Sequence, residues 1–235
     1  MKRFYQSAGI LPSLEGFGIV LDGRPVRTPG RAPLAVPTER LAEAIVAEWN
    51  AQGEKIDPRS MPLTGLANAA IDRIAPERER FARGLAVYGE SDLLCYRAEG
   101  PAPLVRRQSD LWDPILDWAR HRFDVAFEIV AGIIHRPQPS ATIDRLRSAV
   151  LARTPFELAG LSPLVTVSGS LLIALALVEG AIDLDTAWNA ATLDEQWQAE
   201  QWGEDEEATK ALASRRADFE AAARFLGLLP SGEPG

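Results

Sequence analysis

The sequence contains one stretch of 21 residues without a charged side chain, from Leu158 to Val178. A segment of this length can cross a bilayer as a helix. Its first two thirds, however, hold Gly160, Pro163 and three serines, and a proline inside a helix removes a hydrogen bond and clashes with the preceding turn. We therefore expect no membrane insertion. Pro163 should end any helix there, Ser168–Ser170 should cap the next one, and Leu171–Val178 should be a helix buried in a globular core.

A fully buried helix needs a chain long enough to surround it, and 235 residues suffice for one or two domains. The net charge of −8 excludes a general nucleic-acid role, because phosphate binding needs a concentrated positive field. The single cysteine, Cys95, excludes an intrachain disulfide. With only two histidines in the chain, we expect no metal site.

The first part of the chain has the pattern of a small β-sheet. Large side chains at Phe17, Ile19 and Leu21 alternate along one segment, and Asp22-Gly23 follows as a hairpin turn signal. Four prolines divide the segments that come next, and prolines suit the ends and edges of strands. They are Pro25, Pro29, Pro33 and Pro37.

One helix is predicted to cover this sheet. Thr38 is a suitable N-cap, and Leu41, Ile45 and Trp49 recur every four residues, so they share one face. Gly53 should end the helix. With a connector that ends at Pro58, the predicted first domain spans residues 1–58.

The rest of the chain, residues 59–235, has helical patterns almost throughout. We expect Thr64 to cap one helix, Pro76 to open another, and Leu184–Trp202 to form a late one. The predicted fold class is therefore α+β and mostly α. It consists of a small β-rich N-terminal domain with one covering helix, followed by a larger α-helical bundle domain.

Motifs for catalysis are missing from the sequence. It has no phosphate-binding loop, no nucleophile elbow and no dinucleotide-binding fingerprint. Asp110, Asp113 and Asp117 share one helical face, but arginines beside them favour a solvated ion-pair surface. Cys95, between two large side chains, is typical of a buried apolar position. A hydrolase that uses these carboxylates or Cys95 stays open as an alternative.

The segment 195–207 combines tryptophan with acidic and amide side chains. On a helix, Glu195, Gln198 and Trp202 lie on one side, at spacings of three and four, while Trp197 points elsewhere. Two interpretations remain open from these residues. The six tryptophans of the chain could all belong to the core, or this segment could form a polar and aromatic surface of the kind common at protein interfaces.

The pattern E-x-x-Q-x-x-x-W-G of Glu195, Gln198, Trp202 and Gly203 resembles that of the assembly chaperones for the F1 sector of ATP synthase. The similarity is to the family that escorts the alpha subunit, and it covers about residues 3–228. Further matching stretches are Arg3-Phe4-Tyr5, Thr28-Pro29, Val36-Pro37, Glu48-Trp49 with Gln52, Met61-Pro62-Leu63-Thr64, Asp92-Leu93-Leu94-Cys95-Tyr96-Arg97, Gln108, Trp112-Asp113-Pro114 and Trp118.

This resemblance implies a two-domain chaperone that is not an enzyme and has no cofactor. It implies binding to the unassembled alpha subunit, whose subunit interface is shielded until beta joins. Glu195, Gln198, Trp202 and Gly203 are then the expected partner-binding residues, in a protein that we expect to be a monomer. Mitochondrial members carry a transit peptide, and the start of this sequence does not have that pattern. We therefore expect a bacterial cytoplasmic location here, and the mitochondrial matrix for organellar relatives. A generic protein-binding adaptor is the remaining alternative.

The negative charge is concentrated around the same motif. Residues 179–210 hold ten of the 33 acidic residues and one of the 25 basic ones. We therefore expect one acidic surface here, facing basic residues on the client.

Overall fold

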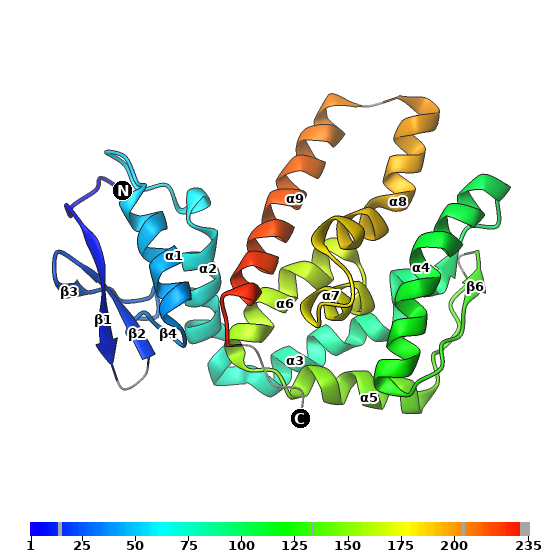
Figure 1. Ribbon diagram of the computed structural model, residues 1–235, viewed down its shortest axis with the longest axis horizontal. Helices are drawn as coiled ribbons and strands as arrows, with labels where there is room; N and C mark the ends of the chain where they lie inside the picture. The colour runs from blue at the N-terminus through cyan, green and yellow to red at the C-terminus, as the bar shows by residue number, and fades with distance from the viewer. Residues whose placement is uncertain (14–15, 133, 204, 231–235) are drawn as a thin grey trace. The chain divides into compact units, whose positions relative to one another are not determined.

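The computed structural model describes residues 1–13, 16–132, 134–203 and 205–230. Its internal contacts separate into two compact units (Figure 1). Unit 1 holds Met1–Arg78, Thr154–Gly160 and the C-terminal residues from Arg224, and unit 2 holds Glu79–Arg153 and Leu161–Ala223. The domain boundary expected at residue 58 stays a prediction, which limited proteolysis of the whole protein tests.

Unit 1 contains a small antiparallel sheet with β2 at its centre. Strand β2 (Gly16–Leu21) pairs with β1 (Ala8–Ser13), β3 (Arg24–Pro25) and β4 (Ala35–Val36). The large side chains of β2 alternate as expected, and Ile19 and Leu21 are buried. The fold class predicted from the sequence is confirmed in this unit by the small sheet and in unit 2 by its helices.

The turn between β2 and β3 uses the predicted residues Asp22 and Gly23. Both have positive φ values, 47° and 77°, as the tight turn of a hairpin requires. The Asp22 carboxylate also accepts hydrogen bonds from the backbone N–H groups of Ser7 at 2.9 Å and Gln6 at 3.1 Å. These bonds hold the pKa of Asp22 below its ordinary value. The turn therefore fastens the start of β1 as well.

Helix α1 (Glu39–Asn50) covers this sheet through contacts with β1 and β2 (Figure 1). The predicted N-cap is confirmed, since the Thr38 hydroxyl accepts a hydrogen bond from the Leu41 N–H at 3.2 Å. Leu41 and Ile45 are fully buried. The helix ends at Asn50, three residues before the expected Gly53. The Gln52 side chain donates to the Glu48 carbonyl and accepts from the Asp57 N–H, and these side-chain bonds take the place of a further helical turn.

Helix α2 (Pro62–Ala69) begins before the expected cap, Thr64, which lies in its first turn. A carboxylate from α1 provides the cap instead: Glu48 accepts from the N–H groups of Leu63 at 2.7 Å and Thr64 at 2.8 Å. Negative charge at a helix N-terminus is favourable for the helix dipole. The cap prediction was wrong because the capping group comes from another helix.

The remaining elements are mostly helices. In the described part of the chain, four short 3-10 helices, one π-helical turn and a parallel strand pair, β5 with β6, occur among them. The bounds are η1 Pro58–Ser60, the π-helical η2 Ala70–Ile74, η3 Ala75–Glu77, α3 Arg78–Ala86, η4 Val87–Ser91, η5 Leu93–Cys95, β5 Tyr96–Arg97, α4 Ala102–Phe123, β6 Val130–Ala131, α5 Ser140–Leu151, α6 Pro155–Ser168, α7 Leu171–Val178, α8 Leu184–Trp202 and α9 Glu206–Gly227. The predicted bounds of α8 are confirmed, and Pro76 lies within η3.

The uncharged stretch folds into α6 and α7. Helix α7 is capped by the Ser170 hydroxyl, which accepts from the Ile173 N–H at 3.0 Å, and all its residues from Leu171 to Ala176 are buried. Pro163, however, does not end a helix but lies inside α6. Burial of side chains on both sides of it, such as Leu161 and Leu164, compensates for the missing backbone bond. None of the helices in the described ranges is long and apolar enough to span a membrane.

Candidate functional site

The expected partner-binding residues lie at the C-terminal end of α8. The first half of this helix is anchored in unit 2, where Ala187, Trp188 and Leu193 are buried and the helix packs on α4 and α7. From Asp194 to Trp202, no side chain of α8 is fully buried. Glu195, Gln198 and Trp202 are exposed on this outer part, as expected of a surface for a partner.

Trp202 is the most exposed large apolar residue in the described part of the chain, with 79% of its surface accessible. The interpretation that all six tryptophans build the core is therefore wrong for this residue, although Trp112 and Trp188 are buried. An exposed indole gains free energy when a partner covers it. Trp202 can therefore act as an anchor for another protein.

Gly203 ends α8 in a backbone conformation that favours glycine, with φ at +90°. Its N–H donates to the Ala199 carbonyl at 2.9 Å, and a Cβ at this position would meet no atom within 4 Å. The requirement for glycine comes from the backbone alone. Gly203 sets the direction in which the chain leaves Trp202.

Glu195 is bound by an arginine that the sequence analysis missed. One guanidinium nitrogen of Arg215, on α9, donates to both carboxylate oxygens, at 2.8 and 3.0 Å. The other terminal nitrogen donates to the Val167 carbonyl at the end of α6, at 3.3 Å. No spacing rule in the sequence links the two residues, because they lie twenty positions apart on different helices.

A second arginine braces α8 against α4. The Arg107 guanidinium donates to Glu200 at 2.8 Å and lies 4.9 Å from the ring centre of Trp197. The hydrogen bond from Arg107 holds the pKa of Glu200 below its ordinary value. Gln108, the next residue of α4, is buried and donates to Asp194 at 2.8 Å. The outer part of α8 is therefore supported from α4 by polar contacts.

Five of the ten acidic side chains in residues 179–210 form ion pairs with basic side chains within the described ranges. Besides Glu195 and Glu200, Glu179 binds both Arg122 and Arg153, at 2.6 and 2.9 Å. Asp185 binds Arg216, and Glu206 binds Lys210. The expectation of one continuous acidic surface was wrong for these carboxylates, because four of these five bind arginines that lie outside the segment. Glu204 lies outside the described residues, and Glu207 is exposed in the first turn of α9.

Two of the alternative catalytic residues, Cys95 and Asp113, are in structural positions, whereas Asp110 and Asp117 are exposed on α4. Cys95 is buried, and this burial raises the pKa of its thiol to about 12, so that the reactive thiolate does not form. Asp113 does accept a hydrogen bond from Arg97, at 2.6 Å. Arg97 is itself buried, lies over the Trp112 ring and also donates to the Leu94 carbonyl. This pair therefore fastens β5 to α4.

Most residues that carry the family resemblance have similar structural roles. Asp92 is fully buried and accepts hydrogen bonds from the Ser170 hydroxyl at 2.7 Å and the Leu172 N–H at 3.0 Å. The Trp112 indole donates to the Ala190 carbonyl at 2.9 Å. Together with Glu48 and Gln108, these side chains join helices within their own unit. Glu195, Gln198, Trp202 and Gly203 differ from them because they lie on the surface.

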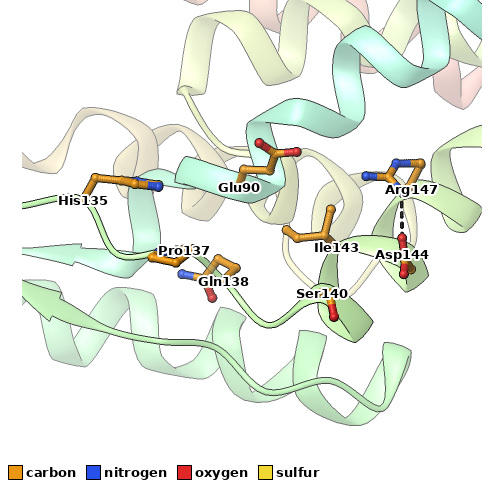
Figure 2. A pocket seen from close by; sticks show the side chains of 8 residues that line it. All are labelled: Glu90, His135, Pro137, Gln138, Ser140, Ile143, Asp144 and Arg147. Atoms are coloured by element: carbon orange, nitrogen blue, oxygen red, sulfur yellow. Dashed lines mark hydrogen bonds and ion pairs between the residues drawn. The ribbon is translucent and has the colours of Figure 1, made fainter.

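Unit 2 also has a pocket of about 260 Å³, and no residue of α8 lines it (Figure 2). Its lining includes an ion pair of Arg147 with Asp144 at 2.7 Å, and His135, whose Nδ1 lies 2.9 Å from the Tyr96 hydroxyl. Within the described ranges, no cluster of three or more His, Cys, Asp and Glu side chains is suited to hold a metal ion. The residues that line the pocket are Glu90, His135, Pro137, Gln138, Ser140, Ile143, Asp144 and Arg147.

Known proteins resemble this chain over nearly its whole length. The profile of the ATP12 chaperone protein family matches residues 2–120. The mitochondrial protein atp12 of Schizosaccharomyces pombe is 26% identical over 219 residues, which cover 88% of this chain and 75% of that protein. The crystal structure of Atp12 from Paracoccus denitrificans is 46% identical, with a TM-score of 0.93 and 97% of both chains covered. A putative chaperone from Agrobacterium tumefaciens is 44% identical, with a TM-score of 0.92, 97% of this chain and 85% of that chain covered.

Proposed function

Because this chain belongs to the ATP12 chaperone protein family, we propose that it assists assembly of the F1 sector of ATP synthase by binding the unassembled alpha subunit. The relatives are named chaperones and not enzymes. The bound chaperone shields the alpha surface that later contacts beta, and it leaves when beta joins. One observation carries this proposal: an almost fully exposed indole, Trp202, stands beside exposed acidic side chains at the end of α8.

An unassembled subunit of a ring exposes apolar surface that is buried in the complete complex, and such a surface promotes aggregation. A chaperone has to cover it and still yield to the larger, permanent interface. A small contact with one aromatic anchor and a polar rim suits this task, because such contacts form quickly and release readily. Trp202 provides the anchor, and Gln198 and Glu207 are rim residues.

Exposed negative charge at the start of α9 favours a basic surface on the client. Glu207 is exposed, and the Asp205 carboxylate, which caps α9 by accepting from the Ala208 N–H at 3.0 Å, is exposed as well. We expect lysine or arginine side chains of the alpha subunit around the pocket that receives Trp202. Binding should then weaken as salt rises, because exposed charges are screened.

The protein is proposed to act as a monomer in the bacterial cytoplasm. The S. pombe relative is named as mitochondrial, and the mitochondrial matrix is the corresponding compartment for organellar members. Light scattering of the purified protein tests the monomer, with a mass near 25.6 kDa as the expected result.

The central experiment is co-purification of the isolated alpha subunit with this protein. Wild type should form a complex at micromolar concentrations and keep alpha from aggregating on dilution from denaturant. Trp202→Ala should weaken binding at least about tenfold, as loss of an aromatic anchor does. The free energy of unfolding should stay unchanged, because the side chain is exposed.

Ile134→Ala is the matched control, since Ile134 is 75% exposed in the same unit but lies in the segment between β6 and α5. This variant should bind alpha like wild type. The proposed function is wrong if wild type neither binds alpha nor prevents its aggregation. Binding to an unrelated protein but not to alpha would favour an adaptor.

A further inference from the structure

We propose that Arg215 is a positioning residue of the client-binding surface, and that Glu195 acts through Arg215 and not through contact with the client. The pair would hold the first half of α9 in place beside the outer part of α8, so that Trp202 and the acidic start of α9 form one surface. This inference rests on the proposed function, because it concerns how the same surface is built.

The bonding of the pair leaves little of the Glu195 carboxylate for a client. Both of its oxygens already accept hydrogen bonds from Arg215, at 2.8 and 3.0 Å. A cation on the client would have to compete with a guanidinium that is in place before binding, and a charge-assisted bond of this kind is among the stronger polar contacts. The carboxylate is therefore already occupied in the free protein.

Arg215 joins three helices of unit 2. Besides Glu195 on α8, it contacts the Val167 carbonyl near the end of α6, at 3.3 Å. The outer half of α9 has few other attachments. Of its residues from Glu206 to Ser214, only Leu212 is partly buried, and the others are exposed. Further along α9, Phe219 is fully buried against Trp188 and anchors the inner half. Arg215 thus stands where the anchored half of α9 ends.

Position along the helices makes this pair a suitable support. Helices α8 and α9 run in opposite directions from the connection that follows Trp202 (Figure 1). Seven residues separate Glu195 from Trp202, which corresponds to about 10 Å along a helix. A change at the pair therefore alters how the outer ends of both helices are placed, although it lies two turns from the indole.

A charge-swap experiment separates positioning from direct contact. Glu195→Lys and Arg215→Glu should each weaken binding of the isolated alpha subunit about tenfold, because each places like charges opposite one another. The double variant, Glu195→Lys with Arg215→Glu, restores the ion pair in reverse and should bind within about threefold of wild type. If Glu195 contacts the client directly, the double variant should bind as weakly as Glu195→Lys.

A second readout needs no client. Hydrogen–deuterium exchange of the free protein should become faster in residues 206–214 in both single variants and return to the wild-type rate in the double variant. The melting temperature should stay the same in all three, because the pair is half exposed and the core does not depend on it. Unchanged exchange in both single variants would overturn the proposed role of the pair.

Arg216→Glu serves as the matched control, with the same change at the next position of α9. Arg216 binds Asp185 and Glu220, toward the anchored half of the helix, so this variant should bind alpha like wild type. Failure of wild type to bind alpha would count against the proposed function, while the exchange measurements would still decide whether the pair positions α9. An Arg215→Glu variant that binds like wild type would overturn the inference.

Discussion

Asp92 and Glu195 are carboxylates of the same unit, and both bind a group far along the chain. Asp92 is fully buried and accepts from Ser170 and from Leu172 at the start of α7. Glu195 is about half exposed and accepts from Arg215 on α9. Both belong to stretches that resemble the same chaperone family. The contrast shows that exposure separates residues that stabilise the fold from residues that build the surface.

The largest expected effect is the loss of the buried carboxylate. Asp92→Ala should lower the free energy of unfolding at pH 7 by about 3 to 5 kcal/mol, because buried donors at Leu94 and Leu172 lose their acceptor. Urea denaturation followed by circular dichroism measures the change. Asp117→Ala, which removes an exposed carboxylate from α4, is the control and should leave the midpoint unchanged. A loss no larger than that of the control would contradict the structural role of Asp92.

The pH dependence of stability should also reveal Asp92. Burial raises the pKa of this carboxyl from an ordinary 3.8 to about 6 in the folded protein. Between these values the folded state holds the proton more tightly than the unfolded state, so this contribution to stability falls as pH rises. Wild-type stability relative to Asp92→Asn should therefore drop by about 3 kcal/mol between about pH 4 and pH 6 and then stay level. A flat difference across this range would show that Asp92 keeps an ordinary pKa.

At the outer end of α8, the largest effect on stability should come from the backbone. Gly203→Ala should cost about 1 kcal/mol, since φ is +90° and alanine is strained there although space is available. Gly84→Ala is the control, because Gly84 lies inside α3 with open space around it and should gain up to about 1 kcal/mol. The urea midpoints of the two variants measure these opposite changes in stability. Equal effects would mean that the conformation at Gly203 is not strained.

The smallest effect should be at the exposed brace between α4 and α8. Glu200→Gln removes the charge that pairs with Arg107, and exposed ion pairs contribute little to stability. The urea midpoint should not change measurably, while Trp197 keeps its contact with the Arg107 side chain. A clear loss of stability would mean that this end of α8 depends on its ion pair as the core depends on Asp92.

Local chemistry explains the predictions that succeeded. The turn at Asp22-Gly23, the Thr38 and Ser170 caps and the bounds of α8 each depend on residues within a few positions of one another. The alternation along β2 and the fully apolar run of α7 likewise predicted which side chains are buried. These signals also placed Glu195, Gln198 and Trp202 on one side of one helix, but they left open whether that side is core or surface.

Distant partners explain the predictions that failed. The prediction that Thr64 caps α2 fails because the capping carboxylate, Glu48, lies sixteen residues earlier in another helix. Pro163 was expected to end a helix, but packing of the neighbouring leucines keeps α6 continuous. The acidic surface expected over 179–210 is divided by arginines from α4, from α9 and from Arg153 just after α5, and no regular sequence spacing relates these arginines to the acids that they bind.

The sequence by itself determined the fold class, the composition of the exposed segment and the family resemblance, because hydrophobic period, turn residues and motif order are properties of neighbouring positions. Only the tertiary structure decided which motif residues stabilise the core and which lie on the surface. It alone showed that Arg215 holds Glu195 and that Trp202 is uncovered. Burial and ion pairing depend on what the folded chain brings near each side chain, and residues far apart in sequence supply those neighbours.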